Sequence, residues 1–290
     1  MKIARFLKDG RERLGKIVGD VVIDLSRAAP DLPQSLREIL EQGASALDRL
    51  HAMGQTEGTT YPLASVKLLA PIPNPSKYLA IGMNYRDHVE EARRASVPIP
   101  QTQVWFNKQV SCIAGPYDDA ILPGVSKQMD YEAELGVVVG KRCRHVSAAD
   151  ARSVIAGYLV TNDFTARDWQ HKSPTWTLGK SFDTHGPIGP WFTTADEIAD
   201  PHALQMQLFV NGEIRQSTST GGMVHNIFEQ IEHLTTVMTL EPGDILATGT
   251  CAGVGVALNP PSFLKPGDVV RVEIESLGYI ENQIITDPYR

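Results

Sequence analysis

Three acidic residues stand where two apolar strands are expected to begin and end. Glu132 and Glu134 lead into an aliphatic run in MDYEAELGVVVG, and Asp163 follows another such run in GYLVTNDFTARDWQ. Val, Leu and Gly at this density favour strands. Residues two apart on a strand point to the same face, so the two glutamates are expected to project side by side.

Paired carboxylates must be neutralised in some way. Two ionised carboxylates about 4 Å apart repel each other by roughly 1 kcal/mol in water and by about 4 kcal/mol at an effective dielectric constant of 20. Either one group protonates, a basic side chain bridges them, or a divalent cation binds. Three carboxylates without a neighbouring His or Cys cluster are hard oxygen ligands, which suit Mg²⁺, Mn²⁺ or Ca²⁺ better than zinc. The alternative is a solvated strand edge with no ion.

A histidine and a glutamate three residues apart could form a general base. In NYRDHVEEA, His88 and Glu91 share one face if the segment is a helix. The carboxylate would then orient the imidazole and stabilise its charge while it takes a proton from water. Glu90 is equally acidic but points elsewhere. The alternative is a surface helix on which the two residues have no joint role.

Lys180 lies in the largely uncharged segment WTLGKSFDTHGPIGPW. A buried lysine must pair with an anion or change its pKa, so Lys180 either supplies positive charge to an oxyanion or forms a structural salt bridge. We interpret His185 in the same segment as structural. The glycine-rich ATGTCAGVGV lacks the lysine of a phosphate loop. It favours a turn whose N–H groups and Thr250 hydroxyl receive a carboxylate.

The remaining patterns predict a mixed α/β chain that is mainly β. Short strands are expected over residues 1–26, a helical stretch over 35–54, and a proline-rich connection that places a domain boundary near residue 68. The expected domains are therefore 1–68 and 69–290. The second contains many short strands, with helices predicted over 147–156 and 224–238.

Composition excludes several classes of protein. The chain has 290 residues and a formal charge of −7, which argues against nucleic acid or an anionic membrane as the main partner. The 3 cysteines show no disulfide spacing, and the charged amino-terminal segment does not fit a signal peptide. No run of about 18 apolar residues is present. These features predict a soluble cytoplasmic protein.

Five phrases taken together resemble the fumarylacetoacetate hydrolase family over about residues 69–280. They are IGMNYRDHVEE, DYEAELGVVVG, TNDFTARDWQ, TLGKSFDTHGPIGP and GDILATGT. The resemblance implies that Mg²⁺ or Mn²⁺ is bound by Glu132, Glu134 and Asp163, and that the HxxE element corresponds to His88 and Glu91. It further implies functional roles for Lys180, Arg167, Gln170 and Thr250.

The family resemblance also implies a β-rich roll of packed sheets, a small amino-terminal domain and a homodimer. Two departures stand out. Cys251 occupies a position where the family commonly has proline, and the additional aspartate ligand of the founding mammalian enzymes has no clear counterpart here.

The activity implied by the resemblance is hydrolysis of a 2,4-dioxo acid, of the acylpyruvate or fumarylpyruvate type. The metal would chelate the 2-oxo acid, His88 with Glu91 would activate a water that attacks C4, and Lys180 with Gln170 would stabilise the oxyanion. Arg167 would hold a substrate carboxylate or brace the metal ligands. Decarboxylation of oxaloacetate, or isomerisation or hydration of a 2-oxo acid, is the alternative. A non-catalytic 2-oxo acid binding protein is a remote one.

Overall fold

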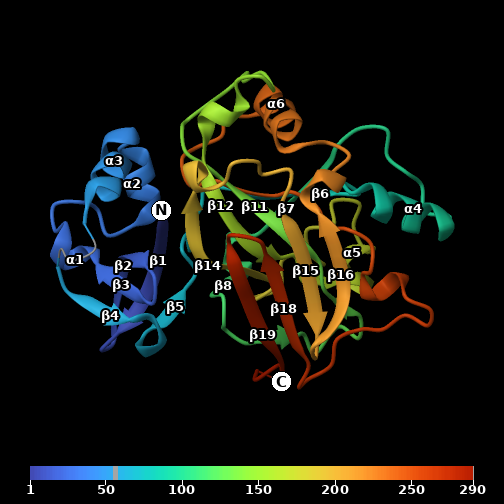
Figure 1. Ribbon diagram of the computed structural model, residues 1–290. Helices are drawn as coiled ribbons and strands as arrows, with labels where there is room; N and C mark the ends of the chain where they lie inside the picture. The colour runs from blue at the N-terminus through green and yellow to red at the C-terminus, as the bar shows by residue number, and fades with distance from the viewer. Residues whose placement is uncertain (55–57, 290) are drawn as a thin grey trace.

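The computed structural model describes residues 1–54 and 58–289 and confirms a mainly β architecture of packed sheets (Figure 1). The larger sheet runs in the order β4 (Thr60–Pro62), β3 (Val21–Asp24), β2 (Arg11–Val18), β1 (Lys2–Lys8), β14 (Gly186–Thr194), β12 (Ile155–Asn162), β11 (Ala133–Val139), β17 (Ile245–Ala247), β6 (Tyr78–Gly82) and β7 (Val104–Lys108). Two short strands join it at the side, β5 (Lys67–Leu69) on β1 and β8 (Ile113–Ala114) on β14.

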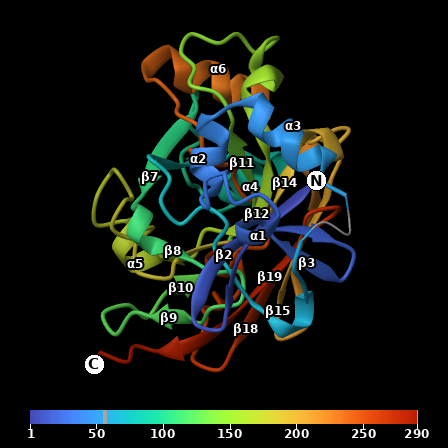
Figure 2. The ribbon, with the colours of Figure 1, turned by 90° about the vertical axis from the view of Figure 1, so that its left-hand side faces the viewer.

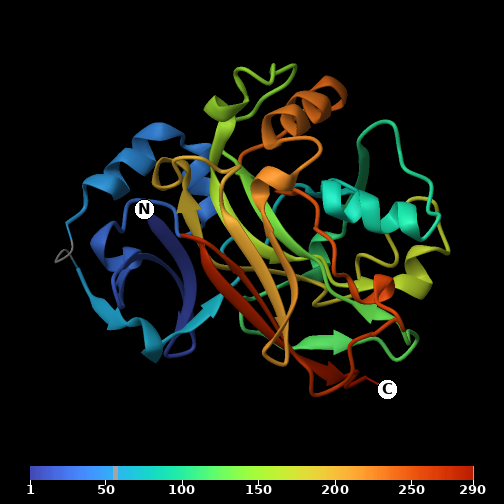
Figure 3. The same cartoon turned by 45° about the vertical axis from the view of Figure 1, so that its right-hand side comes forward.

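A smaller sheet packs against the middle of the larger one (Figure 3). Its order is β16 (Glu213–Ser219), β15 (Gln205–Val210), β18 (Val269–Ile274), β19 (Gly278–Thr286) and β9 (Ala120–Leu122). A separate two-stranded ladder joins β10 (Met129–Asp130) to β13 (Thr165–Ala166). The helices are α1 (Leu25–Ala28), α2 (Leu36–Glu41), α3 (Ala44–Ala52), α4 (Arg86–Arg94), α5 (Arg167–Gln170) and α6 (Ile227–Val237).

Strand β11 lies at the centre of the core and is buried on both faces. Val137 and Val139 pack in the cluster that includes Leu208 and Val272 of the smaller sheet. Val138, on the other face, belongs to the cluster that also contains Ile39 of α2. Burial on both faces explains why this strand is a continuous aliphatic run rather than an alternating one.

The amino-terminal strands continue the larger sheet. Strand β1 pairs with β14 through Lys2 opposite Thr193 and Ile3 opposite Phe192. Figure 2 shows the amino-terminal strands and α1 to α3 grouped on one side of the molecule. The predicted boundary near residue 68 falls within β5, which pairs with β1. We keep that boundary as a prediction.

Two helix predictions needed correction. The stretch 35–54 forms two helices, α2 and α3, separated at Gly43, whose φ of 80° ends the first helix in a left-handed conformation. The predicted helix over 147–156 is wrong apart from the short 3₁₀ turn Ala151–Val154. The apolar residues from Ile155 onward extend β12 instead, because they complete a ladder with β11 and β14. The third helix is confirmed as α6, with a capping box formed by Asn226 and Glu229.

Candidate metal centre and catalytic site

The antiparallel pairing of β11 and β12 brings the three acidic residues together. Ala133 lies opposite Asn162 in the ladder, so the residues around the start of β11 neighbour the residue that follows β12. Glu132, Glu134 and Asp163 are all buried, and one carboxylate oxygen from each lies within 4.8 Å of the others. Because all three are buried, the alternative of a solvated strand edge is wrong.

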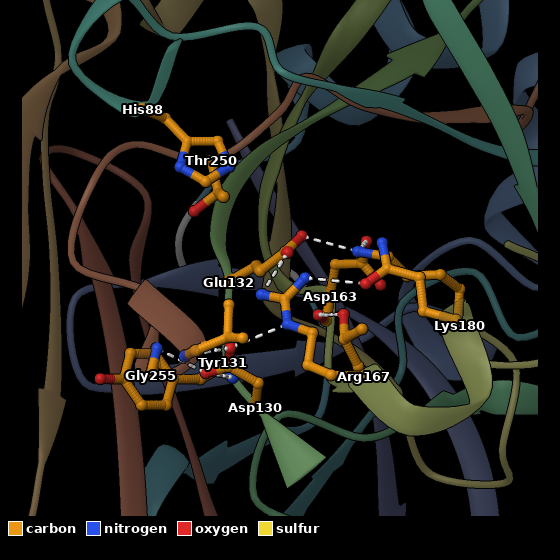
Figure 4. Close-up of polar contacts among 12 residues, drawn as sticks. His88, Asp130, Tyr131, Glu132, Asp163, Arg167, Lys180, Thr250 and Gly255 are labelled. Atoms are coloured by element: carbon orange, nitrogen blue, oxygen red, sulfur yellow. Dashed lines mark hydrogen bonds and ion pairs between the residues drawn. The ribbon is translucent and has the colours of Figure 1, made fainter. Parts of the chain in front are cut away.

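Three cationic side chains neutralise this cluster, and Figure 4 shows two of them, Lys180 and Arg167. The Lys180 ammonium donates to Glu132 at 2.8 Å and to Asp163 at 2.6 Å. The Lys108 ammonium donates to the other oxygen of Asp163 at 2.6 Å and to the Lys180 carbonyl. Arg167 contacts Glu132 at 2.8 Å and donates through Nε to Asp130 at 2.8 Å.

The pKa values of the two glutamates shift in opposite directions. Burial raises the pKa of Glu132, but the charges of Lys180 and Arg167 outweigh burial and lower it to about 2. Burial and the neighbouring carboxylates of Asp163 and Glu132 raise the pKa of Glu134 well above its ordinary value. Glu134 accepts the Gly249 N–H at 3.0 Å, which only partly offsets this repulsion.

The donor set fits a divalent cation of the Mg²⁺ or Mn²⁺ type. All three groups are carboxylates, the hard ligands these ions prefer. Four carboxylates, counting Asp130, face three cationic side chains in this buried cluster, so four minus three leaves one negative charge when all are ionised. A bound dication would add two positive charges and the carboxylate of a small acid would add one negative charge. Together they would change the net charge of the cluster by only one unit.

The predicted His–Glu pair is present on α4. His88 Nδ1 lies 2.8 Å from the Glu91 carboxylate. The other oxygen of Glu91 accepts the Gly253 N–H at 3.0 Å, which ties the helix to the glycine-rich turn. With Nδ1–H donated to Glu91, a neutral His88 carries its lone pair on Nε2.

The dyad and the charged cluster line one cavity of about 240 Å³. Its polar lining residues are His88, Glu91, Glu132, Arg167, Gln170, His171, Lys180 and Thr250. Glu134 and Asp163 lie in contact with this lining through the cluster described above. The structure therefore brings all nine sequence-predicted site residues into one region, while their roles remain predictions.

Three of these residues make contacts that narrow their possible roles. All three guanidinium nitrogens of Arg167 are engaged, the third by Gln170 Oε1 at 3.1 Å, so Arg167 braces the acidic residues. The Thr250 hydroxyl accepts from Gln216 at 2.8 Å. The carboxylate that meets the glycine-rich turn at Gly249 is that of Glu134.

Sequence reasoning missed Lys108, Asp130 and Asn84. Lys108 is a lysine within the apolar stretch VWFNKQVSCI, a signal as strong as the one used for Lys180. Asp130 lies in the same phrase as the glutamates and accepts the N–H groups of Gly255 and Val256 as well as Arg167.

Two other buried residues, Asn84 and His185, donate hydrogen bonds to backbone carbonyls. Asn84 gives no local signal, since its partners are carbonyls far away in the chain. His185 is fully buried, its Nε2–H donates to the Ile121 carbonyl at 3.0 Å, and burial lowers its pKa to about 3. A structural role for His185 agrees with both observations.

Sequence comparison now identifies the group of proteins to which this geometry belongs. Residues 77–285 match the fumarylacetoacetate hydrolase C-terminal family, and residues 1–71 match the Rv2993c-like N-terminal family. The chain belongs to the fumarylacetoacetate hydrolase family. The sequence resemblance is thereby confirmed.

Two mammalian relatives are named as oxaloacetate tautomerases. The mitochondrial oxaloacetate tautomerase of Bos taurus is 45 % identical over 92 % of this chain and 85 % of its own length. The corresponding protein of Homo sapiens is 42 % identical over the same shares.

Solved structures of the family match the whole fold. The fumarylacetoacetate hydrolase of Exiguobacterium antarcticum is 35 % identical, with a TM-score of 0.88, covering 99 % of this chain and 100 % of the other. The maleylpyruvate hydrolase of Sphingobium sp. SYK-6, solved with manganese(II) and pyruvate, is 31 % identical with a TM-score of 0.83, covering 99 % of each chain. In the part of this chain that the structure describes, none of the helices is both long and apolar enough to cross a bilayer.

Proposed function

We propose that this family member is a Mg²⁺- or Mn²⁺-dependent enzyme that moves a proton at C3 of a small 2-oxo acid. The reaction we favour is keto–enol tautomerisation of an oxaloacetate-like substrate. The observation that carries the proposal is that a His–Glu dyad lines the same cavity as Glu132, which belongs to a buried trio of carboxylates. The activity named for the 45 % identical relative from Bos taurus supports the same reaction.

The metal would be held by Glu132, Glu134 and Asp163. Bound there, a divalent cation would withdraw electron density from a 2-oxo group and make the neighbouring C3–H more acidic.

Proton transfer is the part of the reaction that we assign to the dyad. His88 Nε2 takes the proton from C3, and Glu91 stabilises the imidazolium through Nδ1–H. Return of the proton to the 2-oxo oxygen yields the enol, and the reverse sequence yields the keto acid. Arg167 holds Glu132 in place, and Lys180 neutralises Glu132 and Asp163.

Hydrolysis of a 2,4-dioxo acid is the second candidate. In that reaction His88 takes a proton from water, the resulting hydroxide adds to C4, and the C3–C4 bond breaks. The products are a carboxylic acid and an enolate that becomes pyruvate when C3 is protonated. Gln170 favours this candidate, because only its carbonyl oxygen is engaged by Arg167, which leaves the amide N–H groups for an oxyanion. The name of the 31 % identical maleylpyruvate hydrolase supports it too.

We retain two further sequence predictions within this proposal. They are a homodimer, which the family resemblance implies, and a cytoplasmic location, which the composition of the sequence predicts. Size-exclusion chromatography with light scattering measures the first, and fractionation of the native host measures the second.

The deciding experiment follows two readouts with the purified, Mn²⁺-loaded protein. Enol absorbance of oxaloacetate should disappear faster than the uncatalysed rate, and pyruvate release from acetylpyruvate should be measured in parallel. His88→Asn should lower whichever of these two activities is faster in the unmodified protein. The expected loss is about 10²- to 10⁴-fold, the usual contribution of general acid–base catalysis. His233→Asn, an exposed histidine on α6, is the control and should retain activity.

The pattern of results separates the candidates. Enol loss without pyruvate supports tautomerisation, and pyruvate from acetylpyruvate supports hydrolysis. Full activity of His88→Asn in both assays would show that the dyad is not the base.

A further inference from the structure

Part of the lining of the catalytic cavity is an apolar wall. Among the residues that form it are Phe106, Val97, Trp176 and Val254. His88, Arg167 and Lys180 line the cavity too, but each is already engaged by at least one carboxylate. The apolar wall is therefore the part of the lining that remains for an uncharged group of a bound acid.

A second cavity of about 280 Å³ adjoins this wall. It shares Met83, Val97 and Trp176 with the catalytic cavity, and the rest of its lining is Pro98, Ile99, Pro100 and Val104. We call this second cavity the apolar chamber. Its described lining contains no charged side chain.

Trp176 is held as a partition between the two cavities. Its ring meets Phe106 edge-on, with the centroids 5.6 Å apart. On the other side it packs over Gly82, where a Cβ would come within 2.5 Å of Trp176 Cζ3. The indole can occupy this position only because Gly82 has no side chain.

We infer that the apolar chamber binds the alkyl or aryl group at the distal end of a 2-oxo acid. This inference rests on the proposed function, because the 2-oxo carboxylate must bind at the metal ligands for the tail to point past Trp176. Oxaloacetate has four carbons and leaves the chamber empty, whereas a longer apolar tail fills it. A distal carboxylate would find no charged side chain there to pair with.

Binding of 2-oxo acids of increasing length tests the inference without turnover. Isothermal titration of the Mn²⁺-loaded protein with 2-oxobutanoate, 2-oxohexanoate and 2-oxooctanoate should show affinity rising about fourfold for each added methylene until the chamber is full. The six-carbon dicarboxylate 2-oxoadipate should bind more weakly than 2-oxohexanoate.

Two substitutions of the chamber sharpen the test. Val104→Lys places an ammonium in the chamber and should reverse the preference between 2-oxohexanoate and 2-oxoadipate. Val110→Lys, at an exposed valine outside both cavities, is the matched control and should leave the preference unchanged. Gly82→Ala should reduce the increase in affinity with the length of the 2-oxo acid, because the added methyl group displaces the indole of Trp176.

The outcomes distinguish this inference from the proposed function. If no 2-oxo acid binds, the proposed function is wrong and the inference falls with it. If 2-oxobutanoate binds but affinity stays flat with length, or 2-oxoadipate binds best, the chamber does not hold an apolar tail. Loss of a 2-oxoadipate preference in His171→Gln would then assign the distal carboxylate to His171, which lines the catalytic cavity.

Discussion

Asp163 is held by two buried ammonium groups, one on each of its oxygens. Lys108 and Lys180 are almost completely excluded from solvent, and both contacts measure 2.6 Å. Burial lowers the pKa of Lys108, but the charges and hydrogen bond of its neighbours, those of Asp163 first among them, together outweigh burial, and the net shift of the pKa is upward. Both lysines are therefore structural counter-charges of the proposed metal ligand, whatever further part Lys180 has in the reaction.

Lys108→Met should destabilise the metal-free protein by about 3 kcal/mol, the cost of leaving a buried charge with a missing partner. Urea denaturation in EDTA measures the change in the free energy of unfolding. Lys67→Met is the matched control, because Lys67 pairs with Asp118 at 2.6 Å but is 57 % exposed. Its effect should stay below about 1 kcal/mol. Equal effects of the two substitutions would contradict the assignment of Lys108.

Glu134→Gln should weaken Mn²⁺ binding by at least about tenfold. Mutation of a residue that only hydrogen-bonds to a metal ligand already lowers metal affinity by that factor, and we propose Glu134 as a ligand itself. The amide keeps the shape of the side chain but removes one anionic oxygen from the trio. Isothermal titration with Mn²⁺ measures the affinity directly, without substrate. Glu90→Gln on the exposed side of α4 serves as the control. An unchanged affinity for Glu134→Gln would exclude it as a ligand.

At the scale of elements, the loop between β6 and α4 is tied to two distant segments by Asn84. The fully buried Asn84 amide donates to the carbonyls of Thr248 and His225 at 2.8 and 3.0 Å, and its oxygen accepts the His225 N–H. The same turn supplies the Gly249 N–H to Glu134. Asn84 thus relates the helix that carries His88 to the turn that contacts the acidic trio.

Asn84→Asp should lower stability by about 1–3 kcal/mol, because it leaves carbonyls buried without a donor. The activity should fall as well, since α4 loses its fixed position relative to the trio. Thermal denaturation and initial rates measure the two effects. Asn107→Asp, on the exposed face of β7, should change stability by less than about 0.5 kcal/mol. A stable and fully active Asn84→Asp protein would show that this connection does not position the dyad.

At the scale of the whole molecule, the two predicted domains share a sheet and a hydrophobic core. Ile3 of β1 lies opposite Phe192 of β14, and both belong to a cluster that also contains Leu14 and Tyr78. Apolar burial of this kind couples the unfolding of the parts that share it. We therefore expect one cooperative unit rather than two independently unfolding domains.

Scanning calorimetry should show a single thermal transition for the full chain. Ile3→Ala should shift that whole transition downward, by about 2–5 kcal/mol in stability, because it leaves a cavity in the shared core. Ile214→Ala, at a 58 % exposed position, should have almost no effect. Two separate transitions, with only one moved by Ile3→Ala, would contradict a shared core.

Much of the fold could be predicted from local patterns. The aliphatic runs of β11 and β12 and the helices α4 and α6 each depend on neighbours within a few residues, and each was predicted close to its observed place. The helix predicted over 147–156 failed because pairing with two distant strands outweighed a local helical pattern. Gly43 likewise divided one expected helix into two.

The sequence by itself determined the chemical groups of the site and their local spacing. The carboxylates, the His–Glu pair and the buried lysine were recognisable because strand and helix periods relate them over a few residues. Only the tertiary structure decided which charges neutralise one another. Lys108, Asp130 and Asn84 meet their partners through contacts between segments far apart in the chain, and no local pattern encodes such contacts. The apolar chamber beyond Trp176 has the same origin, because its walls come from separate segments that fold together.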